Sequence, residues 1–316
     1  ALAIAPLPFS RKALLMNSRR LTFAVAALAG WTLTAAAATA QTTLRYKFKE
    51  GDTLKYALEQ KMKMTMNVMG NNVDMTMDQF SELAWHIQKV DSKGSAKIAI
   101  KFGRNKMTMD GPTGKVEVDS NNAQEPDDPI GQALYKVIKG LSGLEVTGSI
   151  SPTGEFTDIT LPEKAVKELQ NIPGGDMFGE MLSPEGLKRM MSQSGLVMPK
   201  DAVSKGAKWK SKNEMKLPFG KMIAEVDYTY DGPVEKDGRS LEKIAVKPKA
   251  SIEPTPSAPF SLKLKSHDGG GTALFDNSAG RLLEVSNTQN MEMEIEIMGM
   301  TISQKMVQTM TMKLAK

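Results

Sequence analysis

The sequence predicts a mainly β protein, a β-rich α+β fold. We expect a strongly curved antiparallel sheet or an open barrel, built from two similar halves, with a few helices at about residues 128–195. Apolar and polar residues alternate over long stretches, which is the period of half-buried strands. Short clusters rich in Gly, Asn and Asp separate these stretches, as tight turns require. A methionine-rich segment also occurs twice, as KMKMTMNVMG at residues 61–70 and NMEMEIEIMG at residues 290–299.

The first half reads as a series of strands. Residues 44–48 alternate and predict a first strand, and Glu50-Gly51-Asp52 predicts a turn after it. The next alternating stretch continues to Gly70, and a return strand carries its apolar residues on one parity. A turn at residues 91–94 leads to a third strand, and a hairpin is expected across residues 111–114. The residues expected on one face of the first hairpin are Met62, Met64, Met66, Met75, Met77 and Trp85.

Helical patterns occupy the middle of the chain. From Ile130 to Leu141, apolar residues recur at three- and four-residue spacing, which predicts a short amphipathic helix. Thr160-Leu161-Pro162-Glu163 resembles a capping box and predicts a helix to about Ile172. One or two more helices are expected before residue 193.

The second half repeats the order of the first. Residues 205–209 resemble residues 50–56, and residues 234–247 resemble residues 90–101. A proline-rich stretch at residues 252–259 takes the place of NNAQEPDDP at residues 121–129, and the turn at residues 276–282 resembles residues 151–156. The repeated order predicts an internal duplication. The two methionine hairpins fall early in one half and last in the other, so we expect the first and last strands to lie near each other. The second hairpin contributes Met291, Met293 and Ile295 to the predicted face.

The N-terminal part has the pattern of an export signal. Met16 is followed by Arg19 and Arg20, an apolar run at residues 21–33, and Ala38-Thr39-Ala40. The run is shorter than the roughly 20 apolar residues of a membrane-spanning helix. We therefore expect an upstream extension at 1–15, a signal peptide at 16–40, a first β half at 41–160, a helical connection at 161–204 and a second β half at 205–316. This predicts a periplasmic or extracellular protein with no transmembrane segment after signal removal.

Composition excludes several classes of function. Of 41 basic residues, four lie in the first forty positions, and removing them leaves 37 against 36 acidic residues. A near-neutral chain with 6% aromatic residues has neither the basic face nor the stacking surface of a nucleic-acid-binding protein. The sequence contains no cysteine, so disulfides and thiolate chemistry are absent.

The chain resembles a family of secreted bacterial proteins of unknown function. The resemblance rests on LRYKFKEGDTLKY, the alternating Met/Thr strands, FDNSAGRLLEV and the closing QTMTMKL, and it covers about residues 44–314. These motifs are structural. The resemblance implies an exported β-rich domain and no catalytic residue.

No motif for catalysis is recognisable. The two histidines are His86, expected at the surface, and His267, which precedes three glycines and is expected at a hairpin loop. Glu125, Asp127 and Asp128 could hold calcium, but they lack the spacing and the turn glycine of an EF-hand, so a solvated loop is the simpler interpretation. We expect no cofactor, no catalytic residue and no resident metal.

Methionine is the unusual signal, with 23 in the chain. Met-x-Met on a strand places two thioethers on one face, and thioethers are ligands that suit Cu(I). Methionine is also a flexible residue of apolar cores. Met66 aligns with Ile295, an exchange that a core tolerates and a metal site does not. The sequence therefore favours a non-enzymatic binding protein for a hydrophobic, lipid-like molecule or another envelope component, with the methionine face as its candidate site. A periplasmic Cu(I)-handling protein, a purely structural envelope protein and an enzyme with an unrecognised site are the alternatives.

Overall fold

The computed structural model describes residues 41–163, 167, 196–217, 220–254, 261–297 and 299–315, which belong to one compact unit, Gln41–Lys316. In this part of the chain, twelve strands and one helix are described over their full length. In chain order these are β1 Thr53–Val68, β2 Asn71–Val90, β3 Ala96–Gly111, β4 Gly114–Asp119, α1 Pro129–Leu141, β5 Glu145–Ile150, β6 Phe156–Thr160, β7 Lys208–Leu217, β8 Gly220–Lys236, β9 Arg239–Pro254, β10 Ser261–Asp276, β11 Arg281–Ile297 and β12 Met300–Leu314.

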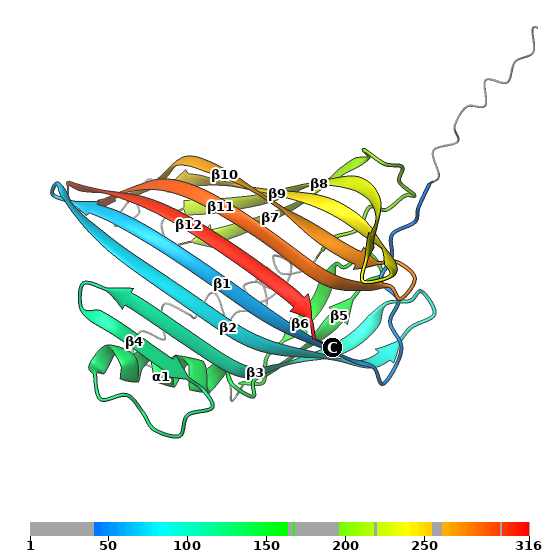
Figure 1. Ribbon diagram of the computed structural model, residues 1–316, viewed down its shortest axis with the longest axis horizontal. Coiled ribbons are helices and arrows are strands. Elements are labelled where there is room, and N and C mark those ends of the chain that lie inside the picture. Colours follow the sequence, from blue (N-terminus) through cyan, green and yellow to red (C-terminus); the bar gives the residue numbers. More distant parts are fainter. Residues whose placement is uncertain are drawn as a thin grey trace, which may run out of the picture. The chain divides into compact units, whose positions relative to one another are not determined.

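All twelve strands belong to a single curved antiparallel sheet that does not close. Its order is β6-β5-β3-β2-β1-β12-β11-β10-β9-β8-β7, and β4 pairs with β3 (Figure 1). The first and last strands pair directly, from Tyr56 opposite Leu314 to Asn67 opposite Ser303. The predicted fold class and the predicted proximity of the first and last strands are therefore confirmed.

One face of the sheet carries the hydrophobic core. In β2 the side chains of Leu83, Trp85 and Ile87 are buried, while His86 between them is exposed. This is the period of two that a strand with one buried face requires. The core cluster joins strands from both ends of the sheet, including Phe156 of β6 and Tyr228 of β8. The sheet must therefore curve around that core, and we call the core-facing side the inner face.

The two halves of the sheet share local features. In the first half, Gly51 N–H donates to Ile87 O and Ile87 N–H to Asp52 O. In the second half, Gly206 and Ala207 form the same two bonds with Tyr230. The register shifts just beyond, between Ile87 and Lys89 in β2 and between Tyr230 and Gly232 in β8. Equivalent bonds and equivalent bulges are what the predicted duplication requires.

The prediction of a strand at residues 44–48 is wrong. These residues form no strand and lie outside the sheet, and Leu44 and Tyr46 are buried in the core. Tyr46 N–H donates to Pro152 O in the β5–β6 turn, and Lys47 N–H donates to Gly280 O in the β10–β11 turn. The β5–β6 and β10–β11 turns, which occupy equivalent places in the two halves, thus bind the backbone of Tyr46 and Lys47. The segment therefore packs against the inner face at one end of the strands.

The predicted amphipathic helix is confirmed as α1. Asp128 caps it, because its Oδ1 accepts from Gly131 N–H at 2.6 Å. Tyr135 and Ile138 of α1 pack with Val116 and Val118 of β4, and Figure 1 shows the helix beside this strand. Asp128 therefore has a structural role within the acidic cluster, and Glu125 pairs with Lys136 at 3.5 Å.

Most of the predicted helical connection at 161–204 lies outside the described residues. Glu163 and Lys167 are helical, whereas residues 196–204 contain no helix and bridge to Thr42 through Val203. Within the part of the chain that the structure describes, no helix has both the length and the apolar character needed to cross a bilayer.

Gly280 provides a test of the packing between the N-terminal segment and the β10–β11 turn. A Cβ at this position would collide with the backbone nitrogen of Lys47, and the φ angle of +63° also disfavours a side chain. We expect Gly280→Ala to lower the free energy of unfolding by about 1 kcal/mol from the backbone angle and by a further ~2 kcal/mol from the collision. Urea denaturation measures the change.

The matched control is Gly70→Ala. Gly70 has φ +85°, but an added Cβ would meet nothing within 4 Å. In this variant the free energy of unfolding should fall only by the cost of the unfavourable backbone angle. Equal losses in the two variants would show that the segment does not press on Gly280.

Candidate ligand-binding site

Cross-strand register gathers the methionines on the inner face. Met75 of β2 lies opposite Met64 of β1, which lies opposite Met306 of β12, which lies opposite Met291 of β11. Residues directly opposite in antiparallel strands point to the same side, with Cβ atoms about 5 Å apart. Four strands therefore contribute one continuous row of thioethers. In β10 the next residue in this row is His267, opposite Met291.

The predicted site residues separate into two groups. Eight of them share the inner face near the tips of the two methionine hairpins and are half-buried: Met62, Met64, Met66, Met75, Met77, Met291, Met293 and Ile295. Trp85 lies apart from this group. It is 5% exposed and packs in the core against Tyr56 and Phe156, with ring centroids 5.2 Å and 5.6 Å away. The structure therefore groups the methionines and Ile295 and assigns Trp85 to the core.

The inner face is filled at one end and partly hollow at the other. Along β12, Met312 is 1% exposed within the core, whereas Met310, Gln308 and Met306 are half-buried. From Met312 toward Met306, with increasing distance from the segment that contains Tyr46, the inner face of β12 thus changes from densely packed to loosely packed.

A cavity of about 320 Å³ lies on this looser part of the inner face. It reaches from β8 to β12, and the sheet must curl for strands so far apart to line one hollow. The apolar wall includes Met222, Val226, Tyr228, Val246, Met291 and Met310. Its size falls within the range of small-molecule sites. Among the predicted residues, only Met291 lines it.

A short chain of polar side chains lies in the wall of the cavity. Ala250 N–H donates to His267 Nδ1 at 2.8 Å, and His267 Nε2 lies 3.0 Å from Gln289 Oε1. Because Nδ1 accepts a backbone hydrogen, the neutral ring carries its proton on Nε2 and donates it to Gln289. Gln289 Nε2 then donates to Asn287 Oδ1 at 3.2 Å. Burial raises the pKa of nearby Tyr228, so its phenol stays a neutral hydrogen-bonding group.

The placement of His267 corrects the expected loop. His267 and the three glycines after it lie within β10, which continues to Asp276. The register shifts between Leu264 and Ser266, so Lys265 is an extra residue in the strand. Such a bulge reverses the parity of the residues that follow. The sequence contains a sign of this bulge. The apolar residues are even-numbered before it (Leu262 and Leu264) and odd-numbered after it (Ala273 and Phe275).

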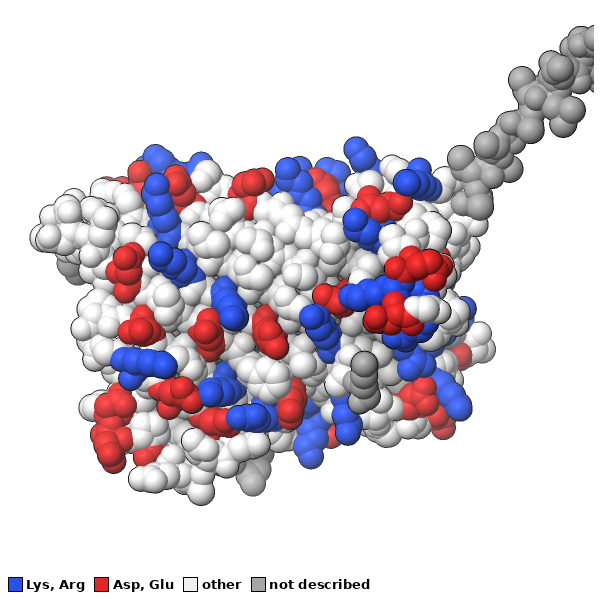
Figure 2. All heavy atoms as spheres, in the orientation of Figure 1, with Lys and Arg blue, Asp and Glu red and all other residues white. Residues whose placement is uncertain are grey.

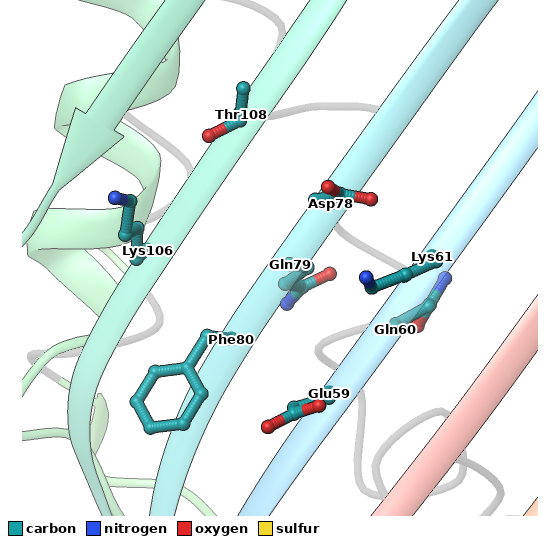
Figure 3. A pocket seen from close by; sticks show the side chains of 8 residues that line it. All are labelled: Glu59, Gln60, Lys61, Asp78, Gln79, Phe80, Lys106 and Thr108. Atoms are coloured by element: carbon teal, nitrogen blue, oxygen red, sulfur yellow. The ribbon is translucent and has the colours of Figure 1, made fainter.

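The outer face has the character of a solvated surface. Figure 2 shows basic and acidic side chains interspersed over it. A shallow hollow of about 280 Å³ lies between β1, β2 and β3, where Lys61 of β1 lies opposite Asp78 of β2 (Figure 3). Glu59 and Lys106 also line it. Mixed charge and free access to solvent do not favour an apolar ligand, so the inner cavity is the better candidate site.

The family comparison confirms the resemblance to a family of unknown function. Residues 93–237 match the model of a family of unknown function, DUF6263. No curated protein matches the chain.

Several solved structures match the chain at low similarity. Lipovitellin, in a structure that concerns its lipid–protein interactions, has 10% identity and a TM-score of 0.46 over 85% of this chain, which spans only 26% of the lipovitellin chain. DynF from the dynemicin biosynthesis pathway of Micromonospora chersina has 8% identity and a TM-score of 0.20, with 86% of this chain and 85% of DynF covered. An outer membrane channel from Pseudomonas putida F1 has 6% identity and a TM-score of 0.23, with 85% and 97% covered. Similarity at this level does not extend to function.

Two methionines of β12 test whether the inner face is filled or hollow. Met312→Ala removes a side chain from the dense core and should lower the free energy of unfolding by about 3 kcal/mol. Met306→Ala, on the same strand and the same face, should cost about 1 kcal/mol, because less apolar surface becomes exposed. Urea denaturation of both variants measures the difference. Equal costs would mean that the methionine face is packed as tightly as the core.

Proposed function

We propose that this protein is an exported, non-enzymatic binding protein that holds a hydrophobic, lipid-like molecule against its inner face. The observation that carries the proposal is the cavity of about 320 Å³ between β8 and β12. Most of its wall is apolar, and His267, Asn287 and Gln289 supply a few grouped polar atoms. An apolar hollow with a small number of fixed polar groups is the usual design of a small-molecule site.

Methionine suits such a wall. Its unbranched side chain has three rotatable bonds and a polarisable sulfur, so it adapts to ligands of different shape. The half-buried row that contains Met64, Met306 and Met291 would extend the apolar surface beyond the cavity toward the hairpin tips. A ligand longer than the cavity could continue along this row.

A Cu(I)-handling function is the second candidate, because the same row places thioethers from four strands next to one another. One of these sulfurs is already engaged, since Gln304 Nε2 donates to Met64 Sδ at 2.6 Å. A competition titration with a Cu(I) chelator tests this function, and binding no tighter than micromolar would reject it. If neither copper nor an apolar molecule binds, a structural role in the envelope becomes the better explanation.

Ala224 offers a direct test of the cavity. It lines the hollow from β8, and Ala224→Trp should fill part of it. We expect the affinity for the neutral fluorescent dye N-phenyl-1-naphthylamine to fall at least tenfold in a fluorescence titration. Native mass spectrometry of the unmodified protein from its own host should also show a bound lipid-like mass.

Ala84→Trp is the matched control for this test. Ala84 of β2 lies between the buried residues Leu83 and Trp85, so its side chain points to the outer face. This variant should bind the dye as the unmodified chain does. An equal loss in both variants, or no dye binding by the unmodified chain, would reject the cavity as the ligand site.

A further inference from the structure

The sheet splits beside the cavity, between β9 and β10. Their pairing runs from Glu242 opposite Phe275 only as far as Val246 opposite Gly271. Each strand continues beyond this point in pairing with its other neighbour. β9 pairs with β8 as far as Pro254, and β10 pairs with β11 from Ser261 onward. Residues 247–254 and 261–270 are therefore strand segments, the second with its bulge at Lys265, that have no ladder between them among the described pairs.

Pro248 gives a physical reason for the split. The N–H of Ala250 points toward β10, because it donates to His267 there. Residues two apart in a strand direct their backbone groups to the same side, so position 248 would also donate toward β10. Proline has no N–H and removes that ladder bond. The side chain of His267 then accepts the next N–H in place of a β10 carbonyl.

Glycines hold β10 on the far side of the split. A Cβ on Gly269 would lie 2.9 Å from Thr288 O, and one on Gly271 would collide with Ser286 O. Both oxygens belong to β11, so β10 follows β11 closely at its last pair with β9, at Gly271, and just beyond it, at Gly269. The split is thus encoded on both of its edges, by proline in β9 and by glycine in β10.

The split lies where the cavity approaches the outer surface. On the inner side, Pro248, Ala250 and His267 line the cavity. On the outer side, Lys247, Gly270 and Gly271 line a second hollow of about 580 Å³. Val246 and Tyr228 border both hollows. The ion pair between Lys247 and Asp268 spans the split at 3.8 Å with both side chains largely exposed, so it adds little resistance to opening.

Charge and polarity differ between the two sides. The inner wall is mostly apolar, whereas the outer hollow is lined by Lys208, Lys210 and Lys247, with Asp227 as its acid. Asp227 already pairs with Lys210 at 3.0 Å and with Lys249 at 2.7 Å. The outer hollow therefore has an excess of positive charge. His267 and Gln289 provide polar groups between the lysines and the apolar wall.

We propose that the β9–β10 split is the mouth of the cavity, and that the ligand is a single-chain amphiphile with an anionic head group. Its hydrocarbon chain passes between the strands onto the methionine face, and its head stays at the outer lysines Lys208, Lys210 and Lys247. This inference rests on the proposed function, because it identifies the ligand class and the route for the same cavity.

A covalent clamp tests the route. The chain has no cysteine, so Lys247→Cys/Asp268→Cys can be joined across the split with a short bis-maleimide. The probe is 11-(dansylamino)undecanoic acid, and stopped-flow fluorescence measures its association rate before and after joining. We expect the clamp to slow association at least tenfold.

The matched control clamps two strands that are already paired. Glu292→Cys/Lys305→Cys replaces an outer-face ion pair of 3.1 Å between directly opposed residues of β11 and β12. Joining these cysteines should leave the association rate within twofold. A rate that is unchanged in the clamped Lys247/Asp268 variant would overturn the proposed mouth. Failure of the unmodified chain to bind any probe would instead reject the proposed function.

A second comparison tests the head group. The methyl ester of the probe has the same chain and no charge, and we expect the acid to bind at least fivefold more tightly. Lys208→Met/Lys210→Met should reduce the affinity for the acid to about that of the ester, whereas Lys61→Met/Lys106→Met, in the other outer hollow, should not change it. Equal affinity of the acid and the ester would overturn the anionic head group.

Discussion

The pairing between β1 and β12 is the constraint on which the rest of the sheet depends. Twelve consecutive residue pairs join strands that begin near the two ends of the described chain. On one side of this pair the chain runs as a meander to β7. On the other side it runs outward to β6, with β4 and β5 both paired to β3. Without the pairing, the two halves would be separate sheets with exposed edges, which aggregate readily. The core could not form either, since it contains side chains from both halves.

Curvature then determines which part of the inner face is filled. The segment that carries Leu44 and Tyr46 packs inside the curve, where corresponding turns of the two halves hold its backbone at Pro152 and Gly280. The aromatic rings of Tyr46 and Phe275 meet there edge to face at 5.2 Å. Filling is therefore concentrated at one end of the strands. Toward the hairpin tips, half-buried methionines replace the dense core, and the cavity lies between these two regions.

Local departures from regular strand geometry shape the site. The extra residue Lys265 turns His267 inward, and Pro248 interrupts the ladder that β9 would otherwise form with β10. Each departure costs hydrogen bonds, and His267 restores one of them by accepting from Ala250. The polar chain from His267 to Asn287 then gives an apolar hollow a defined direction. These features are the basis of our proposal that the ligand is held in one orientation.

The sequence by itself determined the strands, because period-two alternation depends only on neighbouring residues. Met62, Met64 and Met66 had to share a face whatever lay opposite them, and the repeated segment at residues 290–299 had to behave likewise. The cavity depends on how far the sheet curls, which brings β8 near β12 and leaves Trp85 in the core. That curl results from packing among residues distant in the chain, such as Tyr46 with Phe275, and no local pattern records it. The direction of the His267 side chain depends on one bulged residue. The parity change between Leu264 and Ala273 indicates an added residue between them, but only the tertiary structure showed that it precedes His267.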